Sequence, residues 1–363
     1  MSNKANERQY DLDWIRVIAT FGVFLYHSMM FFNPFPWHVK NNEIESSWIL
    51  VFSLFIGLWI MPMFFVISGM NSTYSLSKRS TITFIKERLK RIGIPLLFGI
   101  FILSPPQVYI ERITNLQFTG SFIEFIPYYF DGLYLDIGGD GNFAFSGLHL
   151  WYLLVLFVFS SIFIILFKVI PIRKTLTKFN LFLFPILLFL SGMLHTLALG
   201  GWDLIFYFIV FLYGCYFFFN SDFKEIIKST YKIIAPITVI ATITYIVLFM
   251  IGLPIQGSIQ DFVFYGVKVL ACWGWLCVIF HLGNQYFSFS NNFLTYTSEA
   301  TMPFYVLHQP IIVLIGYMIY DLSWSIPIKL LFLITVSFAL IMTIYHFLIR
   351  KVKILRILFG LKG

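Results

Sequence analysis

Ionisable side chains interrupt several long apolar stretches of this sequence, where charge is costly enough to suggest a function. Arg16 and His27 stand eleven residues apart in one such stretch. Eleven residues advance a helix by about three turns, so both side chains would lie on nearly one face, about 16 Å apart along the axis. A histidine there can act as a general base, and an arginine can hold an anion.

Each of these two residues also has a purely structural interpretation. Arg16 could extend to the aqueous edge beside Asp13. His27 could be a packing histidine with its hydrogen bonds satisfied. The shared helix face favours a functional role for both.

Two further histidines occupy comparable positions. His308, followed by Gln309, lies nine residues after Glu299, or roughly 13 Å along a helix, at a depth similar to that of His27. These two histidines could therefore face a common cavity. His149 begins a run that continues with Leu, Trp and Tyr, which would also suit an interfacial aromatic belt.

A basic run, Arg88-Leu89-Lys90-Arg91, precedes the third apolar segment. Two guanidinium groups can form a fork that matches the oxygens of a phosphate. Ordinary positive charge at the cytoplasmic end of a membrane helix explains the run more simply, and the run taken alone favours that interpretation.

The other polar residues in apolar surroundings carry weaker signals. Lys268 has no evident partner and could line a cavity. The three cysteines lie within apolar runs, and their spacing predicts neither a disulfide framework nor a metal cluster. The histidines near segment ends or in loops are expected to be structural: His38, His195, His281 and His346.

The composition predicts that the apolar segments lie in a lipid bilayer. Of the 363 residues, 59% are apolar and 12% are charged, and Phe alone occurs 45 times. A soluble protein carries roughly a quarter charged residues. The net charge of +8 could indicate a nucleic-acid partner, but the basic residues gather in loops on one side of the predicted membrane. We therefore expect the bilayer, and no nucleic acid, as the partner.

The predicted fold is all-α: a polytopic integral membrane helix bundle that forms one domain over residues 1–363, in the cell (plasma or inner) membrane. A membrane helix needs about 20 apolar residues. Ten segments approach this length, with both termini then cytoplasmic by the distribution of basic residues. They are 14–32, 47–70, 93–110, 149–170, 180–198, 203–219, 232–252, 261–282, 301–320 and 327–349.

The outside loops are nearly free of basic residues and hold only Lys40, Arg112 and Lys329. The longest outside loop spans about 111–148. Its apolar stretch Phe122–Phe130 is too short to span and is expected to cover the outer mouth as an interfacial or re-entrant piece.

Four features in this order resemble the membrane-bound acyltransferase-3 family. They are the Arg16-to-His27 spacing, the Phe-Phe-Val-Ile-Ser-Gly sequence that ends at Gly69, the basic run at 88–91, and the Tyr-Val-Leu-His sequence that ends at His308. Three more stretches resemble the branch of this family that succinylates osmoregulated periplasmic glucans: Trp37–Val39, Arg91–Pro95 and His149–Leu156.

The resemblance implies a ten-helix membrane core that moves an acyl group, acetyl or succinyl, from cytoplasmic acyl-CoA to a glycan or other extracytoplasmic acceptor. It implies that His27 is essential and that Arg16, Arg88 and Arg91 matter. Ser68, within the sequence that ends at Gly69, joins these arginines as an expected donor-binding residue.

Acyl transfer from a thioester to a hydroxyl needs a base for the hydroxyl and donors for the oxyanion. We expect His27 to be the base, with an acyl-histidine intermediate as a variant. Arg88 and Arg91 would hold the coenzyme phosphates, and Arg16 would reach the coenzyme or orient the His27 face. His149 or His308 would contact the acceptor or assist proton transfer. No metal is expected.

A transporter, or an acyl-group translocator without its own transferase chemistry, is the competing class. Intramembrane His and Arg residues also serve proton relays and substrate paths. Transporters are often built from internal repeats. The two halves of this sequence show no convincing repeat.

Overall fold

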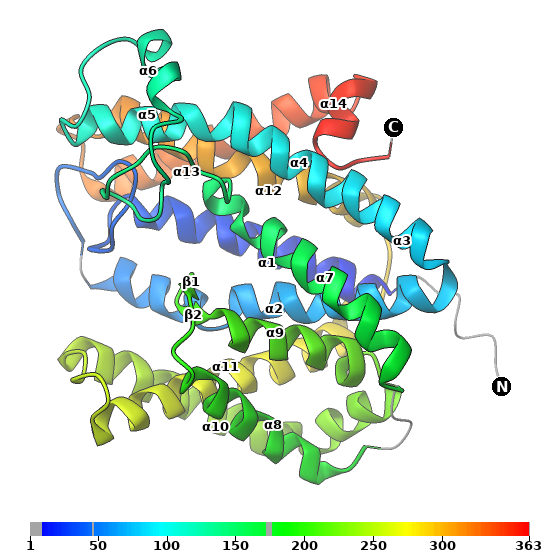
Figure 1. The fold of residues 1–363 in the computed structure, drawn as a ribbon. Helices are drawn as coiled ribbons and strands as arrows, with labels where there is room; N and C mark the ends of the chain where they lie inside the picture. Colours follow the sequence, from blue (N-terminus) through cyan, green and yellow to red (C-terminus); the bar gives the residue numbers. More distant parts are fainter. Residues whose placement is uncertain (1–8, 46, 172–175, 363) are drawn as a thin grey trace. The chain divides into compact units, whose positions relative to one another are not determined.

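The computed structural model describes residues 9–45, 47–171 and 176–362 (Figure 1). Apart from one small hairpin, all the regular structure in these ranges is helical, which confirms the all-α prediction. The described residues form two compact units, each assembled from three separated stretches of chain. The first unit takes its residues from Met1–Ala19, Leu54–Ser80 and Phe159–Ser298, and the second from Thr20–Ser53, Thr81–Val158 and Glu299–Gly363.

The second unit contains five of the predicted site histidines and arginines, and its longest helix includes two π-helical turns. This helix runs without a break from Thr81 to Thr114. Its parts are α3 (Thr81–Arg88), η2 (Leu89–Gly93), α4 (Ile94–Phe98), η3 (Gly99–Leu103) and α5 (Ser104–Thr114). The other elements are the end of α1 (Tyr10–Met30), α6 (Phe122–Tyr128), η4 (Leu148–Leu150), most of α7 (Trp151–Val169), most of α12 (Asn292–Ile319), α13 (Ile326–Thr343), η6 (Ile344–Ile349) and α14 (Lys353–Leu358).

Proline explains the wide turn η2 that carries the basic run. Pro95 lacks the N–H that would otherwise bond to the carbonyl of Arg91. The ladder shifts to π spacing there, with the N–H of Ile94 bonding to the carbonyl of Leu89. Gly360, at a φ of +74°, packs against the freed carbonyl, since a Cβ on it would lie 2.9 Å from the oxygen of Arg91. The C-terminal segment is therefore docked beside the basic run.

The first unit contains the remaining helices and the hairpin. They are most of α2 (Trp48–Lys78), α8 (Lys178–Gly192), β1 (Ala198–Leu199), β2 (Trp202–Asp203), α9 (Leu204–Tyr213), η5 (Gly214–Phe218), α10 (Ser221–Ile251) and α11 (Ile259–Tyr286). Helix α2 packs backbone to backbone on the α9–η5 helix. A Cβ on Gly69 would lie 2.2 Å from the carbonyl oxygen of Phe211, and one on Gly214 would lie 2.2 Å from that of Val66. Small residues permit such close approach between membrane helices, and this packing explains why a glycine occupies position 69.

Lys268 has partners that the sequence did not reveal. Its Nζ donates to the carbonyl oxygen of Gly201 at 2.5 Å and lies 4.2 Å from the centre of the Trp202 ring. Both partners belong to the β1–β2 hairpin, so Lys268 secures that hairpin to α11. The three cysteines are buried and free.

Seven helices among the described residues are long and apolar enough to cross a membrane, which makes this a multi-pass membrane protein. They are Trp48–Lys78, Thr81–Thr114, Leu148–Val169, Ser221–Ile251, Ile259–Tyr286, Asn292–Ile319 and Ile326–Ile349. The other three predicted segments correspond to α1, which begins with two acidic residues, and to the shorter apolar helices Lys178–Gly192 and Leu204–Phe218. The count of ten and the orientation therefore stay predictions.

Helix α5 continues four residues beyond the predicted segment end at about residue 110. The charged pair Glu111 and Arg112 was assigned to the outer loop, but α5 continues to Thr114 and buries both side chains. The loop begins after that turn, and its apolar stretch forms the short helix α6.

The predicted orientation has a direct test. A reporter fused after Arg173, which lies outside the described residues, should be cytoplasmic, and one fused near Gly139 should be extracytoplasmic. Paired alkaline phosphatase and fluorescent-protein fusions would report each side. A cytoplasmic signal at Gly139, or an external one at Arg173, would contradict the ten-span topology.

Candidate functional site

His27 and His308 form a hydrogen-bonded pair within the second unit. Nδ1 of His27 lies 2.7 Å from Nε2 of His308, and the two rings are parallel to within 1° with centres 4.9 Å apart. His308 is buried on α12, and His27 is half-buried on α1. The sequence predicts a similar depth for His27 and His308, and in the structure the two side chains are in direct contact.

The surrounding acceptors determine which ring nitrogen carries each proton. Nδ1 of His308 lies 2.6 Å from the carbonyl oxygen of Tyr305, so this nitrogen must donate. In a neutral His308, Nε2 then accepts, and Nδ1–H of His27 must be its donor. The lone pair of His27 is left on Nε2, which bonds to none of the described residues. The pair therefore presents one basic nitrogen, held in a fixed tautomer.

His149 lies against the same pair. Its ring meets that of His308 edge to face, with centres 5.0 Å apart. Nε2 of His149 donates to the carbonyl oxygen of Val306 at 3.2 Å, and Tyr305 Oη donates to the backbone oxygen of His149 at 2.6 Å. Nδ1 of His149 is buried and has no partner among the described residues. The structure thus brings together three of the four predicted catalytic side chains.

The loop after α1 covers His27 with an aromatic ring. Trp37 is buried, and its ring centre lies 5.1 Å from that of His27. Lys40 fastens this loop, because its Nζ donates to the carbonyl oxygens of Met30 at 2.5 Å, of Phe35 at 3.1 Å and of Asn33. Burial of the ammonium group lowers the pKa of Lys40 to about 8. A cation at the C-terminal end of α1 also suits the helix dipole.

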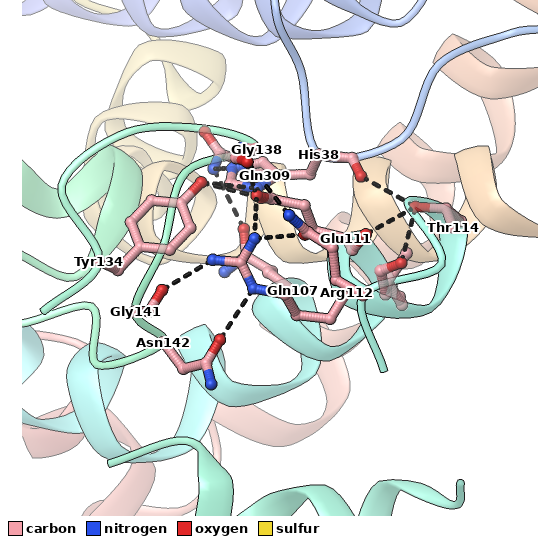
Figure 2. A network of polar contacts seen from close by, with 12 residues as sticks. His38, Gln107, Glu111, Arg112, Thr114, Tyr134, Gly138, Gly141, Asn142 and Gln309 are labelled. Atoms are coloured by element: carbon pink, nitrogen blue, oxygen red, sulfur yellow. Dashed lines mark hydrogen bonds and ion pairs between the residues drawn. The ribbon is translucent and has the colours of Figure 1, made fainter. Parts of the chain in front are cut away.

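A second buried polar network lies in the same unit and involves His38, which was expected to be structural (Figure 2). Nδ1 of His38 donates to Oε2 of Glu111 at 2.5 Å, and its Nε2 lies 3.0 Å from the side-chain nitrogen of Gln309. That nitrogen also donates to Oε1 of Gln107 at 3.1 Å. All four side chains are at most 3% exposed.

Glu111 and Arg112 tie the outer loop to α5. Glu111 accepts from Tyr134 Oη and from the backbone N–H of Gly138, both at 2.8 Å. Burial, together with the neighbouring Glu111 carboxylate, raises the pKa of Tyr134, so this phenol remains a donor. Figure 2 shows the Arg112 guanidinium directed to Gly141 and Asn142, at 2.7 and 2.8 Å. The loop is thus held by buried, charge-assisted bonds.

The predicted donor-binding residues are divided between the two units, unlike the three histidines. The guanidinium of Arg88 lies 4.8 Å from the centre of the Phe84 ring and is half-buried, whereas Arg91 is exposed. Both belong to the second unit. Arg16 and Ser68 belong to the first unit, where Arg16 pairs with Asp13 and the backbone oxygen of Ser68 accepts from Ser72. The role of these four residues in donor binding stays a prediction.

The sequence analysis did not predict three groups that take part in these hydrogen-bond networks: Glu111, Gln107 and the backbone carbonyl of Tyr305. A signal existed for Glu111, because a Glu-Arg pair directly at the end of an apolar run can be buried when both charges find partners. No comparable signal marks Gln107 or a backbone carbonyl. Within the described residues, no group of three or more His, Cys, Asp or Glu side chains is placed to hold a metal ion.

Comparison with known proteins identifies the family of this chain. The chain is 26% identical to glucans biosynthesis protein C of Salmonella gallinarum and of Salmonella dublin, over 344 residues that cover 87% of this chain and 85% of each relative. No solved structure matches it. The acyltransferase domain family matches residues 9–346, and this match includes every predicted site residue. The chain therefore belongs to the acyltransferase-3 family.

Proposed function

We propose that this protein is a membrane-embedded O-acyltransferase that moves an acetyl or succinyl group from cytoplasmic acyl-CoA to a glycan or another extracytoplasmic acceptor. Family membership supports the transferase chemistry. The relatives' name, glucans biosynthesis protein C, supports a glycan as the acceptor. The observation that carries the proposal is the hydrogen-bonded His27–His308 pair with its single unoccupied basic nitrogen.

The pair supplies the base that the reaction requires. As the acceptor hydroxyl attacks the thioester carbonyl carbon, Nε2 of His27 takes its proton. The C–S bond then breaks, and the coenzyme thiolate leaves with the proton that His27 returns. The products are the acyl ester and the free thiol, with no other reactant consumed. In the alternative sequence, Nε2 attacks the thioester itself and forms an acyl-histidine.

His308 stabilises the protonated form of His27 without a carboxylate. When Nε2 of His27 takes a proton, its Nδ1–H still points at the lone pair of His308. His308 can share the positive charge because the carbonyl of Tyr305 accepts from its other nitrogen. Trp37 and the buried surroundings exclude water from this side of the pair.

Arg88 and Arg91 are the proposed ligands of the coenzyme phosphates, with Ser68 and Arg16 as further donors on the same predicted side of the membrane. The wide turn η2 begins directly after Arg88 and contains Arg91. Paired guanidinium groups match phosphate oxygens in a way that a single ammonium does not.

The test uses the purified full-length protein in detergent, acyl-CoA labelled in the acyl group, and the glycan fraction of cells that lack the gene. Label that becomes bound to the glycan and is released by mild base, as an ester, supports the proposal. If the wild-type protein leaves all label on the coenzyme or releases it as the free acid, the transferase proposal is contradicted. The transporter or translocator function then replaces it.

The donor site gives a separate prediction. Changing Arg88 and Arg91 together to Ala should weaken acyl-CoA binding by roughly 10- to 100-fold, since charge-assisted bonds contribute about 1.5–3 kcal/mol. Lysine at both positions should restore only part of the affinity. Isothermal titration with a non-hydrolysable acyl-CoA analogue measures the change.

The matched control for this pair is Lys78→Ala with Arg79→Ala, which removes the same charge from the adjoining turn. The control should bind acyl-CoA as the wild type does. Equal affinities for the two double variants would exclude Arg88 and Arg91 from the donor site.

A further inference from the structure

The side-chain amide of Gln309 has an orientation that is chemically determined. Two acceptors converge on its nitrogen: Nε2 of His38 at 3.0 Å and Oε1 of Gln107 at 3.1 Å (Figure 2). An amide nitrogen has two protons, and both are used here. The oxygen Oε1 is thus the only remaining polar atom of the side chain, and it bonds to none of the described residues.

The orientation of this amide depends on Glu111. A carboxylate 2.5 Å from Nδ1 of His38 requires that nitrogen to carry a proton. The other nitrogen of a neutral His38 is then an acceptor, and it needs the N–H of Gln309. The second acceptor is fixed in the same way, because the amide nitrogen of Gln107 already donates to the carbonyl of Leu103 at 2.8 Å. Each of the two acceptors therefore excludes the orientation of the Gln309 amide in which its oxygen and nitrogen are exchanged.

Gln309 directly follows His308 on α12, at the end of the helix turn whose carbonyl at Tyr305 orients the catalytic pair. The network joins α12 to the loops at His38 and Tyr134, which lie on the predicted extracytoplasmic side. The Gln309 oxygen is an oriented acceptor in a buried setting, so a ligand that approaches from this side must supply a hydroxyl or N–H to satisfy it.

We propose that Oε1 of Gln309 accepts a hydrogen bond from a hydroxyl of the acceptor sugar, and that Glu111 acts through His38 as a positioning residue for this contact. The inference rests on the proposed transferase function. A glycan offers hydroxyls beside the one that reacts, and a fixed acceptor one residue from the catalytic pair selects among them. Sites of this kind discriminate strongly, because a ligand without the donor leaves a buried polar atom unpaired.

The test measures transfer to the glycan fraction of cells that lack the gene, together with acyl-CoA hydrolysis when no glycan is present. Gln309→Ala should lower kcat/KM for the glycan roughly 10-fold or more. The KM for acyl-CoA and the rate of hydrolysis should stay at wild-type values, because His27, Arg88 and Arg91 are unchanged.

Glu111→Gln provides a second variant that keeps Gln309 in place. A glutamine at position 111 can donate to Nδ1 of His38, which allows His38 the other tautomer. Nε2–H of that tautomer would oppose the Gln309 N–H that Gln107 still requires, so the amide would no longer be held by both acceptors. This variant should lower kcat/KM for the glycan in the same direction, with KM for acyl-CoA unchanged. Gln117→Ala is the matched control: Gln117 also makes two hydrogen bonds, to Arg112 and Gly138, but does so on the outer loop.

The outcomes separate this inference from the proposed function. Loss of transfer with retained hydrolysis in both variants, and a normal control, supports the role of Gln309. Wild-type transfer by Gln309→Ala, or a parallel fall in hydrolysis and transfer, overturns it. Absence of transfer by the wild-type protein overturns the proposed function itself.

Discussion

Replacing His27 with Ala should abolish acyl transfer while acyl-CoA still binds. The lone pair on Nε2 is the only basic nitrogen that the His27–His308 pair presents, and its removal leaves the acceptor hydroxyl without a base. Loss of a general base typically costs about 10²- to 10⁴-fold in rate. Steady-state kinetics with labelled acyl-CoA and the glycan acceptor measure this loss as a fall in kcat.

His27→Gln distinguishes catalysis from packing. A glutamine can donate to His308 through its amide, as Nδ1–H of His27 does, but it cannot take a proton at neutral pH. A catalytic His27 predicts that the Gln variant is as inactive as the Ala variant. The control is His281→Gln, which changes a histidine that packs against Tyr231 in the first unit and should remain active. A well-folded, active His27→Gln protein would remove His27 from the mechanism.

His308→Phe should cause the second largest loss, about 10²- to 10³-fold in kcat with an unchanged KM for acyl-CoA. The phenyl ring removes the acceptor of Nδ1–H, so His27 can adopt the unproductive tautomer, and its protonated form loses a partner. A histidine base held in the wrong tautomer is known to lose much of its activity in hydrolases with a Ser-His-Asp triad.

His308→Gln tests whether the accepting lone pair is what matters. The oxygen of a glutamine can accept from His27, so this variant should be more active than His308→Phe. Equal activities of the two variants would mean that His308 acts through its volume alone. A wild-type rate in His308→Phe would remove His308 from the mechanism. His149, whose Nδ1 has no partner among the described residues, would then be the candidate that assists His27.

The parts of the fold that sequence predicts are those that local chemistry decides. Long apolar stretches must satisfy their backbone groups internally, so hydropathy locates the helices. Their polar ends are less predictable, since Thr81–Thr114 and Asn292–Ile319 begin 12 and 9 residues before the predicted segments. The rise per residue of a helix predicts a similar depth for His27 and His308. The spans 149–170 and 261–282 correspond closely to the helices Leu148–Val169 and Ile259–Tyr286.

The parts that sequence did not predict depend on partners far away along the chain. Glu111 was assigned to a loop because a charged pair ends the apolar run, yet it is buried by His38, Tyr134 and Gly138. Lys268 had no visible partner because Gly201 and Trp202 are about 67 residues away. Which ring nitrogen of His27 is free follows only from the carbonyl of Tyr305, two contacts away.

The most direct test of the account places donor and acceptor on opposite sides of a membrane. Purified protein is reconstituted in sealed liposomes that contain the glycan fraction of cells lacking the gene, and acyl-CoA labelled in the acyl group is added outside. The account predicts base-labile label on the enclosed glycan from wild-type protein oriented with its donor side outward. It predicts none from His27→Gln. Label that enters the lumen without becoming bound to glycan, at equal rates for both proteins, would contradict it.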